Sequence, residues 1–526
     1  MRPASVVVQP AAGSRRTVRF NKRSIATSLL FGLNAAVMPL KAYISEPLPW
    51  ALENRHDWIT DCGVNQTACT NALLAFGYNY SQRILPGRSV TFGPGYDITR
   101  TAVSLNQGDT TSFLVQMPVS QYYSIDLRRD ALALGAGRLP DNAFSGVFVS
   151  VFLGFPMAYT TLWSINASAS SVDIYVSSQL PLFSPIYGAT KFGGRVLVTL
   201  YILWLMWVRY YRAYLHLKRN LLDYGLQNGA TSFEIILGDP TSIILVNPLV
   251  AAAFLLDTVS SVDYLSRCMV RVCQVNDLVV FGLATLYLSR TLWFAYAGLG
   301  VASALLKKVK TVRFAALDTT TTALAVSVLA GPLTYLQSRT MVCIDLYFWA
   351  GTGIVRVPNN TIETAFMCVI YISTIALLPI AVGIAYPLLR PPRNVRSLST
   401  TATLAVTQDL KKRCILALAT TSLCRRRRVA PTTSTSSFVD GGTFHVLAHQ
   451  YPMYRNYLCM SQKSADCHVL CTSVGQPQRR VCLTLLFFTD LPVVPAMEPA
   501  AVGTIQGDVF GAHVIHQGRR ASPWVQ

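Results

Sequence analysis

Residues 365–389 read AFMCVIYISTIALLPIAVGIAYPLL, an apolar run without a charged side chain. The hydrocarbon core of a bilayer is about 30 Å thick, and roughly 20 helical residues cross it. Arg390 and Arg393 follow at once, as expected for the cytoplasmic end of a span. The run therefore predicts a transmembrane helix, and four further apolar runs precede it within residues 192–389.

Composition favours the same class of protein. Of the 526 residues, 52% are hydrophobic and only 13% are charged, which is unusual for a soluble protein. The 45 Lys and Arg outnumber the 25 Asp and Glu, for a net charge of +20. Such an excess can indicate nucleic-acid binding. Here the basic residues cluster beside the apolar runs, which favours the positive-inside pattern of membrane proteins and no nucleic-acid partner.

Six apolar runs are candidate spans: residues 24–40, 193–208, 242–261, 287–306, 319–336 and 365–389. Six crossings place both termini and two loops on the cytoplasmic side, and these segments hold most of the basic residues. The predicted fold is an all-α transmembrane helix bundle of about six spans. It carries a small strand-rich or α+β extracellular domain and a largely irregular cytosolic tail.

The first and third runs need comment. The run 24–40 is short for a transmembrane span and could instead be the core of a signal peptide. The long basic segment 1–23, and the lack of a clear Ala-x-Ala cleavage site, favour an uncleaved anchor. The run 242–261 is expected to kink at Pro248.

Residues 42–191 form the predicted extracellular domain. Three glycosylation acceptors lie in it, and a fourth lies in the outer loop 338–364: Asn65, Asn79, Asn166 and Asn359. Cys62 and Cys69 can close a short disulfide loop in an oxidising compartment, the alternative being two free thiols. The β-branched and aromatic runs 89–92, 112–115 and 172–176 suggest strands.

Residues 144–163 are a rival span, because they carry no charge. Their core is rich in β-branched and aromatic residues, which favours a buried strand. A crossing there would also move Asn166 inside and invert the later loops. We therefore interpret the run as a core strand.

Charge inside a predicted span usually marks function, and two such residues stand out. Asp257 and Arg290 come at similar depths near the outer ends of adjacent spans, so we expect them to pair. The alternative is that Arg290 reaches for the lipid headgroups and Asp257 sits at the interface. Arg195 is placed at the outer edge of the span 193–208. Asp263 and Arg267, in the next outer loop, have the i,i+4 spacing of a helical ion pair.

The tail, residues 390–526, is basic and poor in structural signals. A Pro-, Ser- and Thr-rich linker follows its basic run, which can bind anionic lipid or simply be solvated: Arg425, Arg426, Arg427 and Arg428. His445, His449, Cys459, Cys467, His468 and Cys471 lack the combined spacing of a zinc site, which favours ordinary thiols. We expect no metal, no cofactor and no catalytic site, since no catalytic motif occurs.

Three blocks resemble segments of uncharacterised multi-pass membrane proteins of oomycetes: residues 238–248, 287–296 and 330–336. The resemblance covers the bundle and not the tail, and it implies membrane location without implying an activity. The expected function is binding, sensing or anchoring at the cell surface by the outer domain, for an unknown extracellular ligand. The alternative is a transporter or channel with Asp257 and Arg290 near the route of an unknown solute. The expected location is the plasma membrane or secretory pathway.

Overall fold

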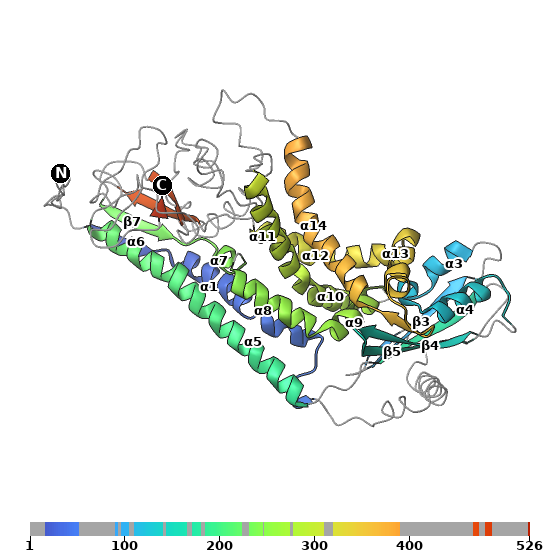
Figure 1. The fold of residues 1–526 in the computed structure, drawn as a ribbon. Helices are drawn as coiled ribbons and strands as arrows, with labels where there is room; N and C mark the ends of the chain where they lie inside the picture. The colour runs from blue at the N-terminus through green and yellow to red at the C-terminus, as the bar shows by residue number, and fades with distance from the viewer. Residues whose placement is uncertain are drawn as a thin grey trace.

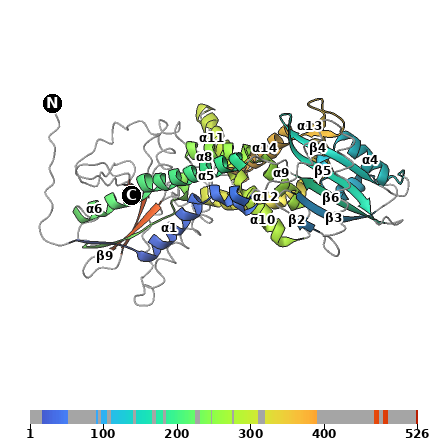
Figure 2. The same ribbon diagram turned by 90° about the horizontal axis from the view of Figure 1, so that it is seen from below.

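The computed structural model describes residues 16–51, 90–92, 96–104, 110–139, 144–165, 171–179, 185–223, 231–245, 247–273, 277–309, 319–389, 466–472, 479–485 and 524–525. A bundle of helices occupies the middle of the molecule, and a β-sheet lies at each end of it (Figure 1 and Figure 2).

The bundle is formed by helices of very different lengths. They are α1 (Lys22–Ala36), α5 (Pro185–Met206), α6 (Arg212–Asp223), α7 (Thr241–Leu245), α8 (Pro248–Val259), α9 (Val262–Cys273), α10 (Leu278–Leu288), α11 (Leu292–Val309), α12 (Thr319–Ser338), α13 (Met341–Thr352) and α14 (Ala365–Leu389). A π-helical turn, Trp207–Tyr211, joins α5 to α6, and the 3₁₀ turn η7, Ser289–Thr291, joins α10 to α11. Two further 3₁₀ turns, η1 (Pro39–Ile44) and η2 (Pro49–Ala51), follow α1.

Three helical stretches of the described chain are long and apolar enough to cross a membrane: Pro185–Asp223, Leu278–Ala302 and Ala365–Ala385. The bent pair α8 and α9, at 74° to each other, raises the number to four if it is counted as one broken span. Helix α14 begins and ends where the sequence predicted a span. The six predicted spans are therefore found only in part.

Two predicted spans are wrong as continuous helices. The run 24–40 forms the 15-residue α1 and then a 3₁₀ turn, and at 1.5 Å per residue α1 is too short to cross alone. The run 242–261 is interrupted before Pro248, because a proline disfavours helix in the residue before it. Pro248 instead begins α8, with the Asn247 side chain as its N-cap. Helix α12 covers the run 319–336, but its four leading threonines reduce its apolar character.

The sheet at one end, here called the outer sheet, has six strands in the order β2-β3-β6-β5-β4-β8. Their bounds are β2 (Val90–Phe92), β3 (Tyr96–Ser104), β4 (Ser145–Phe152), β5 (Phe155–Ile165), β6 (Ser171–Gln179) and β8 (Thr361–Glu363). Strand β8 runs parallel to β4, and the other pairs are antiparallel. Helices α3 (Thr110–Gln116), α4 (Ile125–Gly135) and α13 share a hydrophobic core with this sheet, which includes Phe113, Leu127, Phe148, Ile174 and Tyr347.

The interpretation of residues 144–163 as strand is confirmed, although they form a hairpin of two strands, β4 and β5. The chain reverses at Leu153 and Gly154, both with positive φ. Residues 172–176 lie in β6 as predicted. The run 112–115 is instead part of α3, because a run this short has no periodicity to separate strand from helix.

The sheet at the other end, here called the inner sheet, has the order β1-β7-β9-β10-β11. It combines β1 (Thr17–Phe20) and β7 (Ser232–Ile236) with β9 (Asp466–Thr472), β10 (Arg479–Leu485) and β11 (Trp524–Val525) of the tail. The prediction of a largely irregular tail is thus wrong for these strands. Of these strands β9 pairs with β7, and its residues Cys467 and Val469 are fully buried.

The two sheets divide the chain in a regular way. All strands of the outer sheet come from segments predicted to be extracellular, residues 90–179 and the loop before α14. All strands of the inner sheet come from segments predicted to be cytoplasmic, namely the N-terminus, the loop after α6 and the tail.

Candidate functional site

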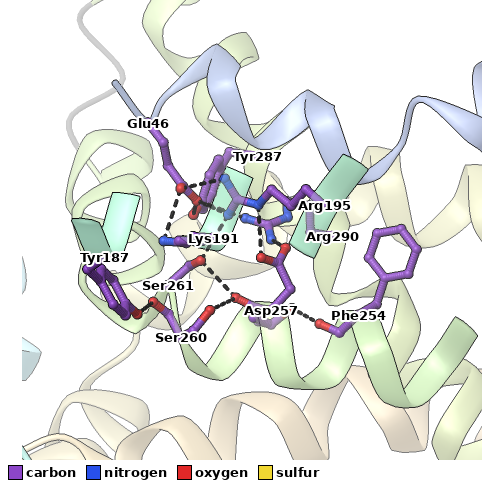
Figure 3. Close-up of polar contacts among 11 residues, drawn as sticks. Glu46, Tyr187, Lys191, Arg195, Phe254, Asp257, Ser260, Ser261, Tyr287 and Arg290 are labelled. Carbon is purple, nitrogen blue, oxygen red and sulfur yellow. Dashed lines mark hydrogen bonds and ion pairs between the residues drawn. The ribbon is translucent and has the colours of Figure 1, made fainter. Parts of the chain in front are cut away.

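Five charged side chains meet among the helices and are here called the charge cluster (Figure 3). They come from the loop between η1 and η2, from α5, from α8 and from η7: Glu46, Lys191, Arg195, Asp257 and Arg290. Each carboxylate contacts at least two cations, so the cluster joins four separate segments of the chain.

Arg195 is the centre of the cluster. Its Nη1 and Nη2 donate to the two oxygens of Glu46 at 2.8 Å each, and its Nε donates to Asp257 Oδ1 at 2.8 Å. Nη2 also donates to Ser261 Oγ at 3.2 Å. The planar guanidinium suits this arrangement, because two of its N–H groups donate to one carboxylate and a third donates to a second carboxylate. The Arg195 side chain is only 2% exposed.

Arg290 contacts the same two carboxylates. Its Nη2 donates to Asp257, and its Nη1 donates to Glu46 Oε1 at 3.2 Å. Tyr287 Oη donates to Glu46 Oε1 at 2.6 Å, and Lys191 Nζ lies 3.0 Å from Oε2. The two residues predicted to pair, Asp257 and Arg290, thus contact each other. Arg290 is buried rather than extended toward headgroups.

Local breaks in the helices position these groups. Helix α8 ends just after Asp257, and the Ser260 and Ser261 hydroxyls donate to the Asp257 carbonyl at 2.9 and 2.8 Å. The 3₁₀ turn between α10 and α11 holds Arg290. Broken helices in membrane proteins free backbone and side chains to line a polar site.

Three cations face two carboxylates in the charge cluster, and a third carboxylate lies close by. Asp263 begins α9 with 1% exposure, and neither of its oxygens has a hydrogen-bond partner in the described part of the chain. The predicted ion pair of Asp263 with Arg267 is wrong. Arg267 contacts a different carboxylate, which lies on the outer sheet.

That contact ties the outer sheet to the bundle. Asp97 of β3 accepts from Arg267 Nε at 2.9 Å and from Arg271 Nε and Nη2 at 2.8 and 2.9 Å. Asp97 is 2% exposed. The pairing joins positions about 170 residues apart, so no local spacing in the sequence could indicate it.

The other predicted site residues fall in two groups. Asn359 is exposed, on the loop that precedes β8, and its carbonyl accepts from Asp126 N at 3.2 Å. Lying outside the described residues are Asn65, Asn79, Asn166, Cys62, Cys69, Arg425, Arg426, Arg427 and Arg428. Cys467, His468 and Cys471 lie on β9, and the described residues hold no group of three side chains arranged for a metal.

Sequence reasoning missed three members of the charge cluster. Arg195 was placed at the edge of a span, and Glu46 and Lys191 were not singled out. The available signal was Arg195 itself, since a charge within an apolar run requires a partner. Which carboxylate would be the partner of Arg195 depended on the fold.

The pKa of Glu46 reflects its neighbours, and this residue lies outside the candidate spans. Burial alone would raise that pKa, but hydrogen bonds from Arg195 and the positive charges of the cluster outweigh it and lower the pKa to about 2. Because its pKa is depressed in the folded state, Glu46 stabilises the fold at pH values above its ordinary pKa of 4.5. This stabilisation is lost as the pH falls toward 2.

Between pH 4.5 and pH 2, protonation of Glu46 should lower the wild-type free energy of unfolding by on the order of 3 kcal/mol. We expect Glu46→Gln to remove this fall, because glutamine does not titrate. Chemical denaturation of the purified protein at several pH values measures this. Asp345→Asn, at a half-exposed carboxylate, is the control and should keep the wild-type profile. An unchanged profile in Glu46→Gln would contradict the assigned role of Glu46.

Comparisons with protein-family models, with curated proteins and with solved structures find no match to this chain.

Proposed function

We propose that this chain is a polytopic integral membrane protein of the plasma membrane or secretory pathway, with both termini cytosolic. Its outer domain, the outer sheet with α3 and α4, binds or senses a ligand at the cell surface. The observation that carries the proposal is the division of the chain into two sheets at opposite ends of one apolar bundle (Figure 1).

Exposed apolar side chains on the bundle support membrane insertion. Large hydrophobic residues face outward on every long helix, among them Leu30, Leu200, Leu256, Leu278, Leu324 and Val369. Exposing apolar surface to water costs about 25 cal/mol per Å², and soluble proteins rarely expose it contiguously. Lipid removes this cost, so a bilayer is the environment that suits the surface.

The way in which the outer domain is attached supports sensing over passive anchoring. Asp97 links the outer sheet to α9, and Arg128 of α4 pairs with Asp345 of α13. Arg128 also lies over the Phe348 ring, 4.3 Å from its centroid. Charge pairs and packed helices of this kind are what physically couple two distant parts of a protein.

Hydrogen exchange on the Asp97→Asn protein in nanodiscs tests sensing. We expect faster exchange in β3 and α9, where two arginines lose their carboxylate, and a further change in β7 and β9 of the inner sheet. Asp130→Asn, at an exposed pair within α4, is the control and should leave the inner sheet unchanged. A change confined to β3 and α9 would contradict coupling and leave an anchoring role.

A second candidate function is transport. The observation in its favour is that the charge cluster lies where helices are interrupted, at η7 and at the 74° bend between α8 and α9. Discontinuous helices of this kind form the binding sites of several transporter folds. In this reading Asp257 and Arg290 lie beside the route.

Flux through proteoliposomes separates the two candidates. If the chain carries protons or chloride, Asp257→Asn should reduce the flux at least about tenfold, because it removes the negative charge beside the proposed route. The Asp345→Asn control should keep the wild-type flux. Equal flux in empty liposomes and in wild-type proteoliposomes would contradict transport of these ions.

A further inference from the structure

The tip of the β4–β5 hairpin presents two large apolar side chains. Phe152 and Phe155 form the last pair of the hairpin, and Leu153 and Gly154 make the turn between them. Leu153 is 69% exposed and Phe155 is 72% exposed. The described part of the molecule therefore leaves this tip uncovered.

The backbone at the tip is unfavourable for leucine. Leu153 has φ +51° and Gly154 has φ +83°, so both turn residues adopt the left-handed region. This is the two-residue hairpin turn in which Asn-Gly is preferred, and the region costs a bulky L-residue roughly 1–2 kcal/mol. A residue held in such a conformation is a reason to look for a role of its side chain.

The tip is fastened to the beginning of α14. Glu363 Oε1 accepts from Leu153 N and from Ala365 N at 3.0 Å each, and Oε2 accepts from Gly154 N at 3.3 Å. Thr364 N and Oγ1 both donate to the Val151 carbonyl at 2.7 Å. Glu363 and Thr364 thus hold the turn against the first residue of the helix.

The register of the sheet places the tip level with that helix end. Strand β8 runs parallel to β4, with Val151 opposite Glu363, and leads directly into α14. Pairing of β5 with β6 begins only at Tyr159, so the hairpin extends past β6 toward the bundle. The next outward residues on α14, Phe366 and Val369, continue the apolar surface.

We infer that the hairpin tip inserts Leu153 and Phe155 into the outer-leaflet interface of the bilayer, beside the start of α14. The occupant of this surface is lipid, because the tip joins the apolar surface of a candidate span. Apolar side chains at an interface bury about 5–10 Å into the headgroup and acyl boundary. The inference rests on the proposed membrane insertion and gives the outer domain a second attachment to the membrane.

Photocrosslinking of the full chain in its membrane tests the inference. A p-benzoylphenylalanine replaces Phe155 in one protein and Ser145 in the other. Ser145 is the matched control, because it is exposed at the opposite end of β4, roughly 25 Å from the tip at 3.3 Å per residue. After irradiation in liposomes of labelled phosphatidylcholine, we expect at least about tenfold more lipid adduct at position 155 than at 145.

Equal lipid adduct at the two positions, or an adduct from position 155 to a second copy of the chain, overturns the inference. Carbonate extraction of the same membranes separates this failure from that of the proposed function. If the chain stays in the membrane while position 155 labels no lipid, only the hairpin inference fails. If carbonate releases the chain, membrane insertion itself fails and the hairpin inference falls with it.

Discussion

Arg195→Met is expected to lower the free energy of unfolding by roughly 3–5 kcal/mol, the cost of breaking a buried ion pair by removing one partner. Methionine fills much of the same volume but leaves Glu46 without two hydrogen bonds and Asp257 without one. Both carboxylates stay inside the bundle with only Lys191 and Arg290 as charged partners. Denaturant titration of the protein in detergent micelles, followed by tryptophan fluorescence, measures the change.

Arg129→Met is the matched control for this prediction. Arg129 also contacts two carboxylates, Asp126 and Asp130, but its side chain is 70% exposed. Exposed ion pairs contribute little, so we expect a change within about 0.5 kcal/mol. Equal effects of the two substitutions would contradict the view that the charge cluster holds the helix ends together.

Gly298→Val is expected to destabilise the protein by about 1–3 kcal/mol, because it forces α11 away from α14. A Cβ at position 298 would lie 3.0 Å from both the Cβ and the carbonyl oxygen of Ala376. The backbone of a packed helix cannot move aside as a flexible side chain can. Small residues at such crossings allow two membrane helices to approach closely. Thermal unfolding followed by size-exclusion chromatography measures the loss.

Gly300, two residues further along α11, is the control. A Cβ there would meet nothing within 4 Å. Gly300→Ala should therefore leave stability unchanged or raise it by up to about 1 kcal/mol, since alanine favours helix over glycine. If Gly298→Val behaved like Gly300→Ala, the close packing of α11 on α14 would be wrong.

The features that the sequence predicted best depend on local composition. Residues 365–389 form one helix, as expected for an uncharged run of this length that ends at arginines. Residues 144–163 form strands because β-branched and aromatic residues dominate them. In both cases the signal lies within the segment itself, so no knowledge of its partners was needed.

The features that were missed depend on long-range contacts. Glu46 binds Arg195 across 149 positions, and nothing near Glu46 distinguishes it from any other acid in a loop. Strands β1, β7 and β9 assemble from three distant segments, one of them the tail, which is poor in structural signals. The span around Arg290 was expected to cover residues 287–306. The helix in fact passes through a 3₁₀ turn there and includes Leu278–Leu288.

In the proposed topology, the outer and inner sheets lie on opposite sides of a membrane. An epitope inserted after Gly137, an open position with positive φ in the turn that follows α4, reports on the outer domain. A second epitope at the C-terminus reports on the side of the inner sheet.

Protease treatment of sealed microsomes that contain the doubly tagged protein is the most direct measurement. We expect the epitope after Gly137 to be protected until detergent opens the vesicles, and the C-terminal epitope to be digested at once. Digestion of both epitopes in sealed vesicles, or protection of both, would place the two sheets on one side and contradict the proposed topology.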